Sequence, residues 1–363
     1  MVIREAMRLT REEITLLNLG SSLDDLANLD PRGYGVCKLL YKAAREHTGA
    51  PLCVNAAKKL ADKLEKGSLV YIMSGFVLHP YEKAETDGII GSVLLARALV
   101  KACGAKPVIM CPEDCVRAVE ALSECVGMKF CRSVNEICCN ENAIGVLVFT
   151  KEESEAEKCA DEIISAGIPD AVIAIECPGA NKKGVYHNAT GIDVSRLEAK
   201  QDILFEKLRD MGVLNIAIGD LGNEIGMNAI GDYIKEKIPY AEEKSCRCSC
   251  EGGILAQTKT DNIITATVSD WGCYAQIAML AFIKGNPDIM HDEDLQKQAM
   301  ITAAENGLID MTGESIPAID GFGIDIICPL VSLMKQLVIN TLSLLQSCGN
   351  WFEKIEELRS FEN

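Results

Sequence analysis

Two short acidic segments carry the side chains best suited to chemistry. The first is ETDG at residues 85–88, and the second is GDLGNEIGM at residues 219–227. Both are glycine-rich turns that follow a predicted strand, and such turns let a ligand approach the backbone closely. Asp87 alone is explained as the cap of the helix that follows, but Glu85 is not. The predicted catalytic acids are Glu85, Asp87, Asp220 and Glu224.

Four carboxylates at one crevice attract positive charge. Oxygen ligands select hard cations such as Mg²⁺ or Mn²⁺, and the sequence lacks the paired histidines typical of zinc enzymes. Neighbouring carboxylates repel a bare phosphate, so they suit a divalent ion or the ammonium group of a substrate. The predicted cofactor is therefore Mg²⁺ or Mn²⁺, and its predicted ligands are the same four acids, Glu85, Asp87, Asp220 and Glu224. An acid of this set that does not bind the metal can serve as a general base.

A third polar segment, residues 175–193, contains Glu176, Lys182, His187 and Asn188. Loops of this kind after strands commonly bind ligands, although a plain surface loop is an equal alternative. A lone histidine is more often structural, and no Ser/His/Asp nucleophile motif is evident. The predicted substrate-binding residues are Gly75, Thr86, Glu176, Lys182, Asn188 and Asn223.

The 17 cysteines are densest at Cys246, Cys248 and Cys250. This CxCxC run lacks the second CxxC pair of a structural zinc site, so the sequence favours ordinary free thiols there over a metal site. The charged N-terminus has no signal-peptide core, and no stretch reaches the roughly 18 apolar residues of a membrane span. Together these features predict reduced thiols and a cytoplasmic protein.

The net charge of the chain restricts the classes of partner that can be expected. Its 363 residues carry 53 acidic and 36 basic side chains, a formal net charge of −17. Such a surface repels phosphate backbones and anionic lipid, so nucleic acid and membranes are not expected as partners. A small-molecule substrate, an amino acid or small anion, fits the acidic segments better. The sequence leaves open whether the protein forms a homo-oligomer.

Alternating apolar runs and amphipathic segments position these residues. Strands are predicted at 68–74, 107–111, 145–150, 171–176, 214–220 and 263–268, and the helices between them at 88–103, 114–125, 153–166, 195–211 and from Asn223 onward. Fully apolar strands that alternate with helices predict an α/β fold, a doubly wound and mostly parallel sheet with helices on both faces. Ligands of such sheets bind beyond the carboxyl ends of the strands, at a switch point.

Further helices are predicted at both ends of the chain. They span 11–26, 35–44 and 54–64 before the first strand, and 271–284, 292–306 and 331–346 after the last one. Residues 1–66 are predicted to form a helical segment that packs on the α/β domain of residues 67–363, in one compact unit.

Five motifs in a fixed order resemble the D-glutamate cyclase C-terminal-domain-like family. They lie at residues 74–80, 85–91, 176–191, 219–227 and 269–275, and the likeness runs from about residue 30 to 345. The resemblance implies a lyase that cyclises D-glutamate to 5-oxo-D-proline with loss of water. Leu221 departs from the pattern, because relatives usually carry glycine there.

Two other functions suit the same residues. Acids around Mg²⁺ or Mn²⁺ after parallel strands also fit a phosphatase that acts on a small phosphate ester, in which the ion clamps the phosphoryl oxygens. A non-catalytic ligand sensor on the same fold is the third reading. The sequence alone does not decide among the three.

Overall fold

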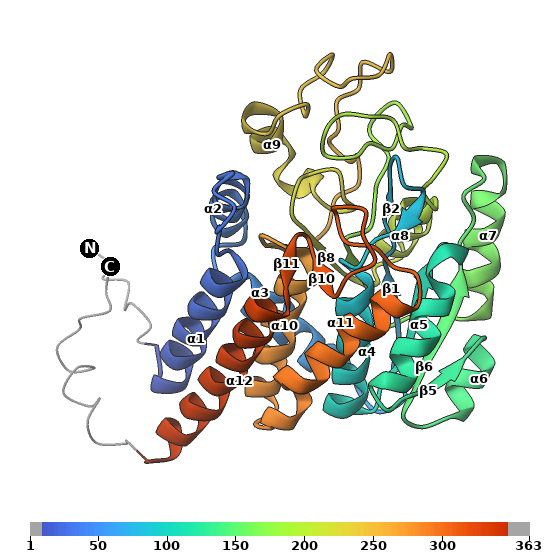
Figure 1. The fold of residues 1–363 in the computed structure, drawn as a ribbon. Helices are drawn as coiled ribbons and strands as arrows, with labels where there is room; N and C mark the ends of the chain where they lie inside the picture. The colour runs from blue at the N-terminus through green and yellow to red at the C-terminus, as the bar shows by residue number, and fades with distance from the viewer. Residues whose placement is uncertain (1–8, 348–363) are drawn as a thin grey trace, which may run out of the picture.

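Seven parallel strands form the central sheet of the computed structural model, which describes residues 9–347 (Figure 1). Their order across the sheet is β5-β6-β4-β1-β7-β8-β9. The strands are β1 (Leu69–Met73), β4 (Lys106–Cys111), β5 (Lys129–Cys131), β6 (Ala143–Val148), β7 (Ala171–Ile175), β8 (Leu214–Gly219) and β9 (Ile263–Thr265). The prediction of a doubly wound α/β fold is confirmed.

Successive side chains of the central strands enter two different cores. Val70 and Ile72 of β1 join one hydrophobic cluster, whereas Tyr71 and Met73 join the other. All four side chains are fully buried. This two-residue period is that of a pleated strand, and burial on both faces explains why the strands read as continuous apolar runs.

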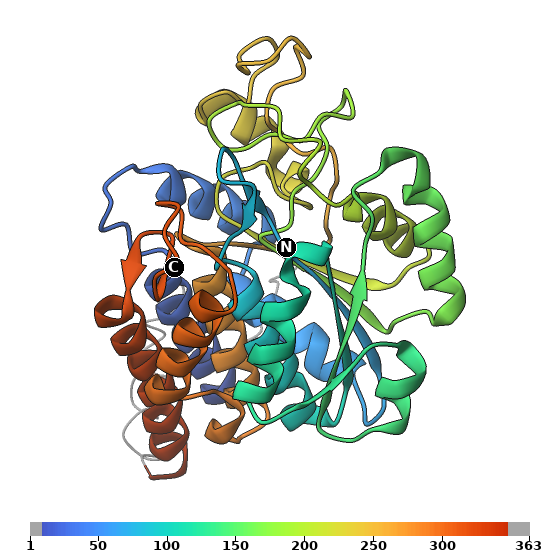
Figure 2. The same ribbon diagram turned by 45° about the vertical axis from the view of Figure 1, so that its right-hand side comes forward.

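Helices cover both faces of the sheet (Figure 2). The smaller core lies under α6 (Val134–Cys139), α7 (Glu153–Ala166) and α8 (Gln201–Asp210). The larger core lies under α4 (Ile89–Cys103), α5 (Glu113–Cys125), α9 (Gly231–Lys237) and α10 (Ser269–Ile283). Buried apolar area of this extent is the main stabilising contribution to such a fold.

The predicted terminal helices add to the larger core. They are α1 (Arg11–Ala27), α2 (Val36–Thr48), α3 (Leu52–Lys63), α11 (Glu293–Glu305) and α12 (Ile324–Ser347). Leu23 of α1, Leu60 of α3 and Val331 of α12 are all buried in it. The boundary between residues 66 and 67 stays a prediction, and residues 348–363 of the second predicted unit lie outside the described range.

Three predicted helix starts are wrong: α12 begins at Ile324 rather than at 331, and two other helices begin late for the same physical reason. The helix predicted from residue 195 begins at Gln201, and the one predicted near Asn223 begins at Gly231, after a 3-10 turn at Asn228–Ile230. In the preceding segments, side chains bind backbone groups that a helix would use itself. The Lys200 ammonium donates to the Ser195 and Glu198 carbonyls of its own segment, and Glu224 accepts N–H groups of its own turn.

The sequence patterns did not predict several short elements. They are β5, α6 and the two hairpins formed by β2 (Val77–Leu78) with β3 (Lys83–Ala84) and by β10 (Ala318–Ile319) with β11 (Phe322–Gly323). Segments of two to six residues are too short to show a clear periodicity. The second hairpin matters below, because its turn carries Asp320.

By length and composition, α12 is apolar enough to cross a membrane, and 33% of that stretch is buried. The expectation that no segment resembles a membrane span is therefore wrong for α12. Isolated polar residues interrupt its apolar run, which is why a count of consecutive apolar residues missed it. In the structure its buried side packs against α1, α10 and α11 (Figure 1).

Candidate active site

Three acidic residues meet at the carboxyl end of the sheet, where the chain reverses its winding direction. After β1 the chain builds β4, β5 and β6 on one side, and then crosses to β7 and β8 on the other. Asp87 lies beyond β1, Glu176 follows β7 directly and Asp220 follows β8 directly. One carboxylate oxygen from each lies within 4.8 Å of the others. This position is the switch point at which doubly wound sheets bind ligands.

Asp87 caps a helix, but not the one that follows it. Its carboxylate accepts the N–H groups of Ser269 at 3.0 Å and Asp270 at 2.8 Å, at the start of α10. Asp270 in turn accepts the N–H groups of Gly88 and Gly91, both at 2.9 Å, at the start of α4. Each aspartate therefore satisfies the free donors of the other residue's helix. These crossed caps lock α4 and α10 together beneath the acids.

The two glycines of the first motif make room for this arrangement. A Cβ on Gly88 would lie 2.7 Å from the Cβ of Glu176, and Gly88 has a φ of +80°. A Cβ on Gly91 would lie 2.3 Å from Oδ1 of Asp270. Both distances are below van der Waals contact, so any larger residue would displace an acid. The motif thus encodes close approach of α4 to the acids.

Glu176 has an unusual backbone and a satisfied carboxylate. Its φ is +42°, a region that costs free energy for any residue other than glycine and that clusters at functional sites. The Ser269 hydroxyl donates to its Oε2 at 2.6 Å. Burial, and then the charge of Glu224, raises the pKa of Glu176 well above its usual range. The side chain is 6% exposed.

Asp220 has the least satisfied carboxylate of the three. Its Oδ1 is buried and has no hydrogen-bond partner. Burial, followed by the charges of Glu176 and Asp320, raises the pKa of Asp220 well above its usual range. Asp320, at the β10–β11 turn, in turn pairs with Arg32 at 3.4 Å. A buried carboxylate oxygen without a donor is costly unless a proton or a cation reaches it.

Glu85 lies in the same acidic environment without joining the close group of three. It is 6% exposed, and burial followed by the charge of Glu176 raises its pKa well above the usual range. The neighbouring Thr86 donates its hydroxyl to the Ala318 carbonyl at 2.8 Å. Thr86 therefore ties the first motif to the hairpin that carries Asp320.

Glu224 holds the second motif in shape. Its Oε1 accepts the N–H groups of Asp220 at 3.1 Å and Leu221 at 2.8 Å, and its Oε2 accepts that of Gly222 at 2.6 Å. Both oxygens are thus engaged by the turn itself. Among the described residues, the group of close carboxylates contains Glu176 in its place.

This geometry can be set beside known proteins. The profile of a family described as D-glutamate cyclase-like, C-terminal, matches residues 23–334, most of the chain. The chain belongs to this family. It is also 25% identical to human D-glutamate cyclase, mitochondrial, over 261 residues, which are 70% of this chain and 37% of that protein. The chain therefore spans little more than a third of the length of this relative.

The other predicted substrate-binding residues serve mainly to hold loops of this D-glutamate cyclase-like chain. Gly75 has a φ of +107°, and a Cβ there would lie 2.7 Å from Pro112. The Asn188 carboxamide oxygen accepts N–H groups within its own turn. Lys182 forms an ion pair with Glu243 in the outer loops.

Asn223 differs from this set. Its Nδ2 donates to the His187 carbonyl at 3.0 Å, but its Oδ1 is buried and without a hydrogen-bond partner. Like Oδ1 of Asp220, this atom is an acceptor that lacks a donor. Asn223 therefore stays a predicted substrate-binding residue, and its Oδ1 can accept a hydrogen bond from a ligand.

Three residues of the site were not among the predicted site residues. Ser269 and Asp270 stand in the fifth family motif, so a signal for them existed in the sequence. Asp320 precedes Gly321 in a tight turn, and an Asp-Gly pair was the available sign of that hairpin. Neither the fifth motif nor the Asp-Gly pair indicates that these residues contact acids more than 40 positions away in the sequence. Only the fold shows that contact.

The acid group fits a divalent cation. Asp87, Glu176 and Asp220 offer hard oxygen ligands at short mutual distances, and Oδ1 of Asp220 lacks a partner. Among the ion pairs of residues 9–347, only the one between Arg32 and Asp320 brings a cationic side chain to this group. The positive charge that these acids require is therefore mostly missing from the protein itself.

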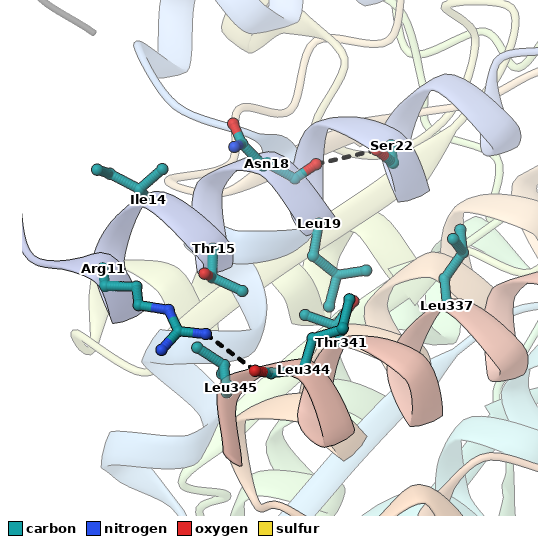
Figure 3. Close-up of a pocket in the computed structure, with 10 residues that line it drawn as sticks. All are labelled: Arg11, Ile14, Thr15, Asn18, Leu19, Ser22, Leu337, Thr341, Leu344 and Leu345. Carbon is teal, nitrogen blue, oxygen red and sulfur yellow. Dashed lines mark hydrogen bonds between the residues drawn. The ribbon is translucent and has the colours of Figure 1, made fainter. Parts of the chain in front are cut away.

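The acids lie away from the hollows between the outer helices. Figure 3 shows one such hollow, of about 270 Å³, lined by side chains of α1 and α12 such as Leu19 and Leu337. It contains none of the acids. Asp87 and Asp220 are only 1% and 3% exposed. A reaction at these acids would take place in a site from which bulk water is largely excluded.

Proposed function

We propose that this protein is a lyase that cyclises D-glutamate to 5-oxo-D-proline and water. Membership of the D-glutamate cyclase-like family and the human relative support the reaction class. The observation that carries the proposal is the convergence of Asp87, Glu176 and Asp220 within 4.8 Å in a buried site. Such a site suits a substrate with an ammonium group and moves protons among neighbouring carboxyls.

The chemistry requires two proton movements. The amino nitrogen bonds to the side-chain carboxyl carbon, and one carbon–oxygen bond of that carboxyl breaks. The ammonium group loses two protons in total, and the departing oxygen gains two and leaves as water. A base near the nitrogen and an acid near the oxygen are therefore both needed.

A group of acids with raised pKa values supplies both roles. Burial and mutual repulsion raise the pKa of Asp87, of Glu176 and of Asp220, so the group holds protons to a higher pH than isolated carboxyls do. An ionised member accepts a proton from the ammonium group. A protonated member donates one to the departing oxygen. Asp220 is the proposed base, because its Oδ1 has no other hydrogen-bond partner.

The proposed cofactor is Mg²⁺ or Mn²⁺, held by Asp87 and Glu176 with Glu85 beside them, which leaves Asp220 to act as the base. When bound, the ion would neutralise the substrate carboxylate and make it a better electrophile. Glu224 is proposed to act through the turn that positions Asp220. The proposed partner is a small amino acid, and the cytoplasmic location stays a prediction.

Product formation tests the proposal directly. The purified chain is incubated with D-glutamate, with and without Mg²⁺ or Mn²⁺, and 5-oxoproline is followed by NMR. We expect product that depends on the chain and is lost in Asp220→Asn. Absence of product under all three conditions contradicts the cyclase function. Hydrolysis of an aryl phosphate that requires Mg²⁺ would instead support the phosphatase alternative.

A further inference from the structure

A second group of metal-binding side chains lies outside the acid site. His187, Cys246, Cys248 and Cys250 bring one nitrogen and three sulfur atoms within 4.8 Å of one another. They come from two loops that rise side by side above the carboxyl end of the sheet (Figures 1 and 2). One loop follows β7 and the other follows α9. The proposed cyclase reaction uses none of these four side chains.

Four of the six distances among these atoms can be compared with the edges of a tetrahedron around a metal ion, and three of the four agree closely. The Sγ atoms of Cys246 and Cys250 are 3.6 Å apart, and those of Cys246 and Cys248 are 3.8 Å apart. Nε2 of His187 lies 3.1 Å from Sγ of Cys248 and 3.5 Å from Sγ of Cys250. Zinc bonds of ordinary length predict edges of about 3.8 Å between sulfurs and about 3.6 Å between nitrogen and sulfur.

Disulfide bonds do not explain the cluster. All three cysteines are free, and their sulfurs are much farther apart than the roughly 2.05 Å of a disulfide bond. Three thiols and an imidazole in one place are also a poor apolar core. The CxCxC spacing places every second side chain of one short loop at the same point. A bound metal ion would stabilise this arrangement.

A backbone donor and an amide donor reach the sulfur of Cys250, as such donors do at metal-bound thiolates. The N–H group of Gly252 lies 3.3 Å from Sγ of Cys250, and Nδ2 of Asn181 lies 3.5 Å from it. Asn181 is 3% exposed and is held by the Gly253 carbonyl at 2.7 Å. Such donors stabilise negative charge on sulfur and fix the orientation of a ligand.

The histidine is suited to bind a metal as a neutral ligand. His187 is fully buried beside the three sulfur atoms. A neutral imidazole offers a lone pair to the metal, whereas an imidazolium does not. Its Nε2 is the atom that faces Cys248 and Cys250.

We propose that His187, Cys246, Cys248 and Cys250 bind a structural zinc ion. Three thiolates and one imidazole are a common ligand set for zinc, and four protein ligands leave no open position for catalysis. Soft thiolate ligands also separate this site from the oxygen ligands of the acid site. The two sites therefore select different metals.

The zinc ion would join two loops that reach the acid site. The N–H group of Arg247 donates to the Gly191 carbonyl, so the loops already touch beside the cluster. The His187 carbonyl accepts Nδ2 of Asn223, in the turn that carries Asp220. A metal ion at His187 thus stabilises the loop that contacts this turn. Its expected role is to hold the outer wall of the site.

Metal analysis of the full-length chain, purified under reducing conditions, tests the proposal. We expect about one zinc ion per chain in the wild type, bound at this four-ligand site. The zinc content per chain of Cys248→Ser and of Cys250→Ser should be at least ten-fold lower than that of the wild type. Cys138→Ser and Cys139→Ser are matched controls, because both cysteines are exposed on α6 and lie outside the cluster. Asp220→Asn should also keep its zinc, which separates this site from the acid site.

A second measurement covers the case in which the cysteine variants do not fold. Metal-depleted wild-type protein is titrated with Co²⁺, and the visible absorption of tetrahedral cobalt thiolate is followed. Zinc should then displace the cobalt and abolish the absorption. Wild-type protein that contains no zinc, and that takes up neither Co²⁺ nor Zn²⁺ when reduced, overturns the proposal and leaves the cluster as free thiols.

Discussion

The acid group and the thiol group are built in opposite ways. Asp87, Glu176 and Asp220 follow three neighbouring strands of one sheet, so the sheet fixes their distances before any ligand binds. The thiol group joins two loops, and Cys246, Cys248 and Cys250 are all partly exposed. Rigid elements hold reactive groups in place, whereas loops depend on their ligand for order. The comparison supports two different proposals: an acid site that the fold prepares for a substrate, and a thiol site that a metal ion would complete.

The energetics of the two groups also differ in sign. Buried carboxylates that repel one another oppose folding, and the crossed caps of Asp87 and Asp270 offset part of that cost. A metal ion bound only to the folded state stabilises it. We therefore expect changes at the acids to affect turnover most, and changes at the thiols to affect stability most.

The largest expected effect is the loss of turnover in Asp220→Asn and Glu176→Gln. Each change keeps the shape of the side chain but removes its capacity to accept a proton. General acid–base roles contribute about 10²- to 10⁴-fold, so kcat for 5-oxoproline formation should fall by at least about 10²-fold. Turnover within ten-fold of the wild type would place the chemistry elsewhere.

The matched control for these variants is Asp24→Asn. Asp24 on α1 is also a buried aspartate, and it accepts the N–H groups of Leu52 at 2.6 Å and Cys53 at 3.0 Å. Its loss should lower the free energy of unfolding by about 1–2 kcal/mol, as for other helix caps. Turnover of the folded fraction should stay at the wild-type level, because Asp24 lies outside the acid group.

A second prediction concerns stability at the thiol group. Cys248→Ser should lower the unfolding midpoint far more than Cys138→Ser does. Saturation at 100 times the dissociation constant stabilises a protein by about 2.7 kcal/mol, and tight zinc binding exceeds that level. Thermal unfolding with and without added zinc measures the effect. Equal midpoints for the two variants would show that the cluster does not stabilise the fold.

The fold could be predicted from the sequence because its strands are buried on both sides. β1, β7 and β8 read as continuous apolar runs between amphipathic helices, and the boundaries of most predicted elements agree within a few residues. The predicted helix starts were wrong where side chains bind the backbone groups that a helix would otherwise pair with each other. Lys200 binds carbonyl groups of Ser195 and Glu198, and Glu224 binds N–H groups of its own turn, so these two segments do not form helices although their composition favours it.

Only those site residues that directly follow predicted strands could be expected from the sequence to meet. Asp87 and Asp220 follow strands, and their meeting at the switch point could be expected. The crossing of caps between Asp87 and Asp270 joins residues 183 positions apart, and no local pattern reports it. The same limit applies to His187, which looked like a lone histidine because its three sulfur partners lie about 60 positions further along the chain.

A third prediction tests the close packing under the acids. Gly91→Ala places a methyl group 2.3 Å from the Asp270 carboxylate, which two backbone N–H groups hold. Overpacking of this kind typically costs about 1–3 kcal/mol, so the free energy of unfolding should fall by that amount in a denaturant titration. Gly323→Ala is the control, because nothing lies within 4 Å of its added Cβ. Equal stability of the two variants would mean that α4 and Asp270 move apart freely.

The smallest expected effect is a difference in the sign of pH dependence between the two groups. Burial raises the pKa of Asp270 from 3.8 to about 7, and the pKa values of Asp87 and Asp220 also lie above their usual range. Between about pH 4 and 7 the unfolded chain has released protons that the folded acid group still holds, so stability falls as pH rises. Each carboxyl contributes at most about 1.4 kcal/mol per pH unit, and Asp220→Asn should reduce the slope.

The thiol group should give the opposite slope. Thiolates bind zinc only after they lose their protons, so zinc stabilises the folded chain more as pH rises. The free energy of unfolding, measured from pH 5 to 7 without added Mg²⁺, therefore separates the groups. Relative to the wild type, Asp220→Asn should gain stability as pH rises, and Cys248→Ser should lose it. Differences of the same sign for both variants would contradict the distinction between a charge-strained acid site and a metal-stabilised thiol site.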